Sequence, residues 1–122
     1  MKRDMELVRK MVLLMEDHPS GRAPRGMNIE GYTREQLGYH AYLLVDCGLA
    51  EGSDVTTTGH SGPEYMISHL TSAGHDFADS ARTQYIWDEV TAEMKEKGIV
   101  SATLDILKKL LNKKIKKQLD AD

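Results

Sequence analysis

Histidine, cysteine and carboxylate side chains are the groups in this chain that could bind a metal ion or act as acids, bases and nucleophiles. The five histidines are His18, His40, His60, His69 and His75, and the one cysteine is Cys47. The sequence contains no His-x-x-x-His and no Cys-x-x-Cys pair, and its nearest approach is His75 with Asp79, four residues apart on one helical face. We therefore expect ordinary surface or hydrogen-bonded histidines, with no metal and no cofactor.

Cys47 and His40 are the only nucleophile and base that lie close in sequence. On one helix, seven residues span two turns, or about 10 Å along the axis, which is too far for a hydrogen bond. The segment 59–62 contains two glycines, but it lacks the lysine and the strand–helix context of a phosphate-binding loop. The sequence therefore predicts a protein without catalytic residues, which is not an enzyme.

Side chains suited to DNA occur in the segment 33–47 and in the loop expected after it. Arginine and glutamine can make bidentate contacts with base edges, and tyrosine can reach phosphates. The expected contacts with double-stranded DNA are Arg34, Gln36, Tyr39, His40 and Tyr42 in this segment, Thr57, Thr58 and His60 in the loop, and Lys2, Arg3, Lys113 and Lys114 near the chain ends. In the alternative interpretation, Tyr39, His40 and Tyr42 pack against other helices.

The segment Tyr32–Leu49 is the element around which the other predicted elements are arranged. Thr33 and Gln36 form the pattern of a capping box at the start of a helix. Gly48 ends the helix, and Leu49 is expected to fold back onto it. Gly38 leaves open whether the segment is one helix or two.

The other predicted elements are read from caps, breakers and apolar spacing. They are a helix from Asp4 to about Asp17, a short edge strand over Met27–Glu30, strands over Ala50–Thr57 and Tyr65–Leu70, a helix from Thr71 to Lys97 and a last helix capped by Ser101. In the second strand, Tyr65, Ile67 and His69 are expected on one face and Met66, Ser68 and Leu70 on the other.

These elements predict a mainly α fold with a small β-wing, in the α+β class. A winged-helix-like domain is expected over residues 1–97, followed over residues 98–122 by an amphipathic, lysine-rich helix. That last helix has a leucine seam, so it is expected to pack on its own domain. The alternatives are a homodimer through this helix, binding to an acidic surface and docking on a partner protein.

Composition indicates where the protein resides. The single cysteine excludes an internal disulfide and is typical of a reducing compartment. The charged beginning MKRDMELVRK lacks the apolar region of a signal peptide, and no apolar run reaches the length of a membrane span. We expect a cytoplasmic protein that does not contact a membrane.

Three segments together resemble a small bacterial family that is described as a domain of unknown function and is often found in prophages. They are MKRDMELVRKMVLLMEDHP, GYTREQLGYHAYLLVDCGLAE and HLTSAGHDFADSARTQYIW. The Leu-Thr-x-x-Gly element at 70–74 is also similar to the wing-to-helix junction of winged-helix regulators. The resemblance implies a winged-helix-like fold and a phage setting, and it supplies no catalytic residues.

The distribution of charge along the chain helps to distinguish DNA binding from docking on a protein. Residues 1–25 carry a net charge of +2, residues 26–82 carry −6, and residues 83–122 carry +1, within a total of −3. DNA affinity comes largely from cations that meet phosphates, so the acidic middle weakens the leading expectation, a phage-associated DNA-binding regulator. The alternative is a phage protein that docks on a host protein, which an acidic and apolar face on the central helix would favour.

Overall fold

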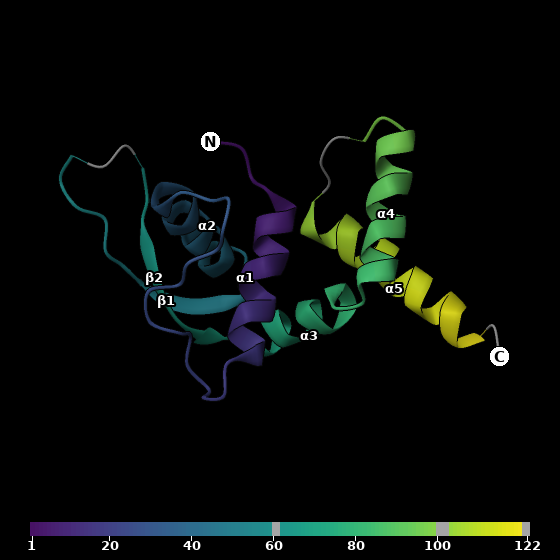
Figure 1. Ribbon diagram of the computed structural model, residues 1–122, viewed down its shortest axis with the longest axis horizontal. Helices are drawn as coiled ribbons and strands as arrows, with labels where there is room; N and C mark the ends of the chain where they lie inside the picture. Colours follow the sequence, from purple (N-terminus) through teal and green to yellow (C-terminus); the bar gives the residue numbers. More distant parts are fainter. Residues whose placement is uncertain (60–61, 100–102, 121–122) are drawn as a thin grey trace. The chain divides into compact units, whose positions relative to one another are not determined.

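The computed structural model describes residues 1–59, 62–99 and 103–120 (Figure 1). Within these residues the chain is mainly helical with one two-stranded antiparallel sheet, which confirms the predicted α+β class. The elements are α1 (Met5–Asp17), α2 (Arg34–Asp46), β1 (Ala50–Asp54), β2 (Tyr65–Leu70), α3 (Ser72–Ala81), α4 (Gln84–Glu96) and α5 (Leu104–Asp120).

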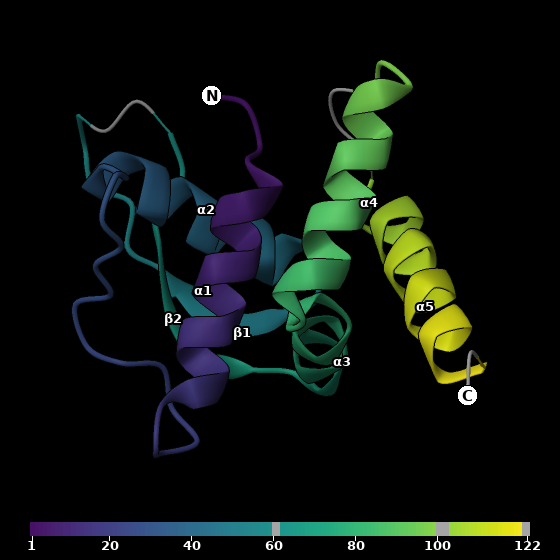
Figure 2. The same ribbon diagram turned by 45° about the vertical axis from the view of Figure 1, so that its right-hand side comes forward.

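Contacts divide the chain into two compact units, Met1–Asp76 and Phe77–Asp122, with the boundary inside α3. The sequence analysis had placed a domain boundary at residue 97 instead. In the first unit, α2 packs against both strands, and α1 packs against α2 and β2 (Figure 2). In the second unit, α4 packs against α5.

The helix α1 begins and ends as the sequence predicts. The Asp4 carboxylate accepts hydrogen bonds from the N–H groups of Glu6 and Leu7, at 2.9 and 3.2 Å. The helix stops at Asp17, because Pro19 disfavours helical geometry at His18, which is extended.

The helix α2 is one uninterrupted helix, which answers the question that Gly38 raised. The capping box of Thr33 and Gln36 is present, with bonds of 2.8 and 3.1 Å. Gly38 is needed for packing, because a Cβ there would lie 2.7 Å from the Glu64 side chain. At the other end, Gly48 has a φ of 80°, and the Leu49 N–H donates to the Leu44 carbonyl at 2.9 Å, the bond of a Schellman cap.

The hairpin differs from its prediction in length and in alternation. β1 ends at Asp54 rather than at Thr57. A register shift lies opposite Glu51 and Gly52, which pair with His69 and Ile67, so Ser68 has no partner on β1. Such a bulge reverses the faces that follow it. The predicted alternation therefore fails at Leu70, which is buried although it was assigned to the same face as the exposed Met66.

The predicted edge strand over Met27–Glu30 is wrong, because these residues form no strand. They lie between two glycines with positive φ, Gly26 at 59° and Gly31 at 91°, and turns at both ends leave too little extended chain to pair. The loop is instead tied to β2 by the Ala23 N–H, which donates to the Ser68 carbonyl at 2.8 Å.

His40 joins the two helices of the first unit. Its side chain is buried, with 1% of the residue exposed. Its Nε2 accepts a hydrogen bond from the Asp4 N–H at 2.9 Å, so the ring proton lies on Nδ1, which donates to the Gln36 carbonyl at 2.8 Å. The ring therefore fixes the first residues of α1 against α2.

The single helix predicted from Thr71 to Lys97 is two helices, α3 and α4. The Thr71 cap is confirmed, since its hydroxyl accepts from the Gly74 N–H at 3.1 Å. The chain then breaks at Thr83, which has the extended backbone of an N-cap and starts α4. Gly98, with a φ of 74°, follows the end of α4, close to the predicted helix end at Lys97.

The start of α5 is described from Thr103 onward, so the predicted cap Ser101 lies outside the described residues. The Thr103 hydroxyl accepts a hydrogen bond from the Ile106 N–H at 3.2 Å and supplies a cap. Leu107 and Leu111 of the predicted seam are buried. Ser80 of α3 donates to the Asn112 side chain at 2.7 Å, which links α3 to α5 within this unit.

Replacing Gly74 with alanine is expected to lower the free energy of unfolding by about 1–3 kcal/mol, because the added Cβ would overlap the Leu49 carbonyl oxygen. Urea unfolding followed by circular dichroism measures the change. Gly21→Ala is the matched control: a Cβ there meets nothing within 4 Å, so a change within about 0.5 kcal/mol is expected. Equal stability of the two variants would contradict this packing argument.

Replacing His40 with phenylalanine is expected to cost about 1–3 kcal/mol of unfolding free energy, because the ring is kept while the Asp4 N–H loses its acceptor. The same urea titration measures the loss. Tyr39→Phe serves as the control, since the Tyr39 hydroxyl makes no hydrogen bond to a described residue. An unchanged midpoint for His40→Phe would show that the bond to Asp4 contributes little.

Candidate functional site

The residues predicted to contact DNA from α2 occupy three different environments. Arg34 is 90% exposed in its side chain, and its Nε lies 3.7 Å from the Glu64 carboxylate. Gln36 uses its side-chain oxygen in the capping box. Neither residue is therefore an uncommitted polar group on an open helix face.

The expectation that His40 lies on an exposed face is wrong, because the ring is buried and both of its nitrogens are hydrogen-bonded within the first unit. Tyr39 and Tyr42 are half-buried. Their ring centroids lie 5.8 Å apart, and Tyr42 makes an edge-on contact of 5.3 Å with Tyr65 of β2. Tyr42 therefore packs on β2 rather than on another helix, and the fully exposed residues of α2 are Arg34, Glu35 and Asp46.

The other predicted DNA contacts lie outside α2. Thr57 and Thr58 are exposed in the loop after β1, and His60 lies outside the described residues. Lys2 and Arg3 precede α1 and are exposed. Lys113 and Lys114 belong to the second unit.

The two lysines of α5 differ in their surroundings. Lys113 is exposed, whereas the Lys114 Nζ lies 3.5 Å from the Glu93 carboxylate of α4. A hydrogen bond from Lys97, together with the charge of Lys114, lowers the pKa of Glu93 and keeps this carboxylate ionised. Lys114 is therefore partly neutralised within its own unit.

The charge of the first unit is acidic as a whole. Residues 1–76 contain seven arginine and lysine residues against eleven aspartate and glutamate residues, a net charge of −4. A phosphate backbone would meet a repulsive average potential at this surface.

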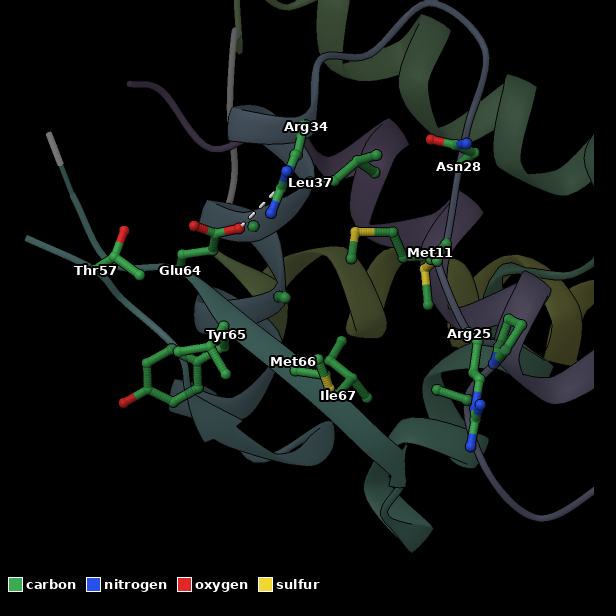
Figure 3. A pocket seen from close by; sticks show the side chains of 17 residues that line it. Met11, Arg25, Asn28, Arg34, Leu37, Thr57, Glu64, Tyr65, Met66 and Ile67 are labelled. Carbon is green, nitrogen blue, oxygen red and sulfur yellow. Dashed lines mark ion pairs between the residues drawn. The ribbon is translucent and has the colours of Figure 1, made fainter. Parts of the chain in front are cut away.

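The first unit contains a groove of about 920 Å³ (Figure 3). It lies between the loop 23–28, the helices α1 and α2, and the strand β2. Its apolar lining consists of Met11, Ala23, Pro24, Met27, Leu37, Ala41, Val55, Met66 and Ile67. Three of these side chains are methionines, whose flexible thioethers adapt to ligands of different shape.

The polar groups of the groove are few. In Figure 3, Arg34 and Glu64 lie together at one part of the groove, and Arg25 lies apart from them. Arg25 is exposed and forms no ion pair or hydrogen bond with a described residue. An apolar floor with an unpaired cation at its edge suits a ligand that is apolar and carries a negative charge.

Cys47 follows the last turn of α2. Its Sγ donates to the Leu44 carbonyl at 3.6 Å, and burial of the thiol raises its pKa, which disfavours the reactive thiolate. Within residues 1–59, 62–99 and 103–120, no three histidine, cysteine or carboxylate side chains gather as metal ligands. No helix in the described part of the chain has both the length and the apolar character needed to cross a membrane.

Sequence reasoning missed the groove. Its lining comes from five separate segments, so no local spacing reveals it. The available signal was the composition, since seven methionines against one phenylalanine indicate adaptable apolar surfaces. One of these methionines, Met66, is 65% exposed.

Comparisons with known proteins agree with the predicted resemblance to a bacterial family. A protein described as "Uncharacterized protein" from Haemophilus influenzae is 28% identical over 113 residues, which cover 90% of this chain and 92% of that protein. No solved structure matches the chain. The model of the family DUF2513, described as a hypothetical protein, matches residues 2–100. The chain belongs to the DUF2513 family.

Proposed function

We propose that this protein is a non-enzymatic binding module, of winged-helix type, that holds an apolar segment of a protein partner in the groove beside β2. The order α1, α2, β1, β2, with α2 packed on the hairpin, supports the winged-helix assignment. A cytoplasmic protein of a phage that docks on a host protein is the setting that we propose.

The groove is the main observation that supports this proposal. Its volume of about 920 Å³ lies near the upper end of the range of ligand sites, roughly 300–1,000 Å³. It is open to solvent along β2, where Met66 is 65% exposed. An exposed thioether beside a buried aliphatic floor is typical of surfaces that accept apolar protein segments.

Charge supports a protein partner over DNA for the first unit. The net charge of residues 1–76 is −4, and the one arginine of α2, Arg34, shares its charge with Glu64. The exposed face of α2 adds tyrosine rings, which are enriched in protein interfaces.

DNA binding is the second candidate, and one observation favours it. The helix α5 carries six lysines, and Lys113 is among those that face solvent. A lysine-rich helix can meet phosphates, and a homodimer through this helix would bring two such faces to one duplex.

Selection of random displayed peptides on the full chain tests the protein-binding proposal. Peptides that bind the native chain are expected to lose about tenfold or more in affinity for Met66→Lys, because the charge enters the groove. Leu119→Lys is the matched control, since it replaces another exposed apolar side chain, 73% exposed on α5, with the same charge. Circular dichroism melting checks that both variants fold. Recovery of no peptide, or equal binding to both variants, would contradict the proposal.

Fluorescence anisotropy with a labelled duplex at about 50 and about 200 mM salt tests the second candidate. The protein-binding proposal predicts no binding at either salt concentration, because the first unit offers too few free cations. Binding that weakens steeply with salt and is lost in Lys113→Ala would favour DNA instead. Gln118→Ala is the matched control, because it replaces an uncharged side chain of the same helix. Thr103 is left unchanged, because its hydroxyl caps the helix.

A further inference from the structure

We propose that the partner segment binds as an extended strand added to the free edge of β2, with a carboxylate of the partner meeting Arg25. This inference rests on the proposed protein-binding function and names the form and the charge of the ligand. It is carried by three observations: an unpaired strand edge, an apolar groove beside it and an unpaired cation in the groove wall.

At residues 65–67, the edge of β2 that faces away from β1 forms no backbone hydrogen bond to a described residue. The Val55 N–H donates to the Glu64 carbonyl at 2.9 Å, so Val55 and Glu64 are a hydrogen-bonded pair. In an antiparallel pair, such positions alternate with positions whose N–H and C=O groups point outward. The outward groups are therefore those of Tyr65 and Ile67, and neither residue makes a further backbone bond to the described part of the chain.

The loop leaves space for a strand and also sets its length. Among the described residues, its one backbone hydrogen bond to β2 is that of 2.8 Å from the Ala23 N–H to the carbonyl of the bulged residue Ser68. In Figure 3, the loop residues Arg25 and Asn28 lie across the groove from Met66 and Ile67. Three residues of β2 before the bulge, 65–67, are thus open to pairing, which is about 10 Å of strand.

An added strand would place every second side chain over the groove. Strand residues alternate between the two faces of a sheet, and the sheet face covered by α2 is the apolar one. Leu37, Met11 and Ile67 line this side. The ligand is therefore a segment with apolar residues at alternate positions, and its backbone supplies affinity while these side chains supply selectivity.

Charge complementarity adds the third requirement. Arg25 lies in the groove wall without an ion pair among the described residues, whereas Arg34 already has Glu64. A partner carboxylate beside Arg25 would form a charge-assisted contact at the edge of an apolar surface. The same position would repel a lysine.

Nuclear magnetic resonance of the full ¹⁵N-labelled chain tests the inference with two defined pools of synthetic peptides. Each pool contains peptides of about seven residues, with mixed valine, isoleucine, leucine and methionine alternating with threonine. One pool carries glutamate at both ends and the other carries lysine. The glutamate pool is expected to bind about tenfold or more tightly than the lysine pool and to slow hydrogen exchange of the Tyr65 and Ile67 amides at least about tenfold.

Two kinds of control isolate the strand and the charge. The glutamate pool is also made in two N-methylated forms, each with methyl groups on one of the two alternating sets of backbone amides. Each form keeps the side chains but loses the N–H donors along one edge of the peptide strand. The form that loses the donors facing β2 is expected not to bind. Arg25→Glu is expected to reverse the preference between the glutamate and lysine pools. Arg22→Glu makes the same charge change in the same loop outside the groove and is expected to preserve the preference.

The outcomes separate this inference from the proposed function. Strand addition would be overturned if neither pool slowed hydrogen exchange of the Tyr65 and Ile67 amides. It would also be overturned if the two N-methylated pools bound equally well. If displayed peptides nevertheless bind in a manner that depends on Met66, the groove binds a partner in another form and the proposed function stands. If neither displayed peptides nor pools bind, both proposals fail.

Discussion

The first unit depends on Thr71, where the end of α2, the start of β1 and the first turn of α3 meet. The Thr71 N–H donates to the Leu49 carbonyl at 3.0 Å, and its hydroxyl donates to the Gly48 carbonyl at 2.6 Å. The same hydroxyl accepts from the Gly74 N–H. Helix ends and strand ends leave backbone groups without partners, and this one residue satisfies several of them at a single point.

This junction fixes one end of β2, and the other end is fixed at the base of the hairpin loop. There the Thr56 hydroxyl accepts from the Glu64 N–H at 2.9 Å, while Glu64 packs on Gly38 of α2. Held at both ends, the strand accommodates an extra residue as a bulge at Ser68, whose carbonyl then holds the loop. The groove follows from this path, because the hydrogen bond that holds the loop to β2 is at the bulge.

The sequence predicts best the features whose partners are close in the chain. The caps at Asp4, Thr33 and Gly48 involve residues within a few positions of each other, so their patterns are visible without a structure. His40 is different, because its partner Asp4 is 36 residues away and nothing local distinguishes a buried ring from an exposed one. Gly38 likewise looks like a helix break until the position of Glu64 is known.

The wrong prediction of a strand at residues 27–30 is connected with the groove. A strand there would pair with β2 and close its edge, whereas the observed loop leaves residues 65–67 of this edge open. A two-stranded hairpin is marginal by itself and gains stability from a third strand. Under the proposed strand addition, the partner supplies the third strand that the loop does not form. Binding and stability are therefore linked, because a ligand that binds only the folded first unit must raise its free energy of unfolding.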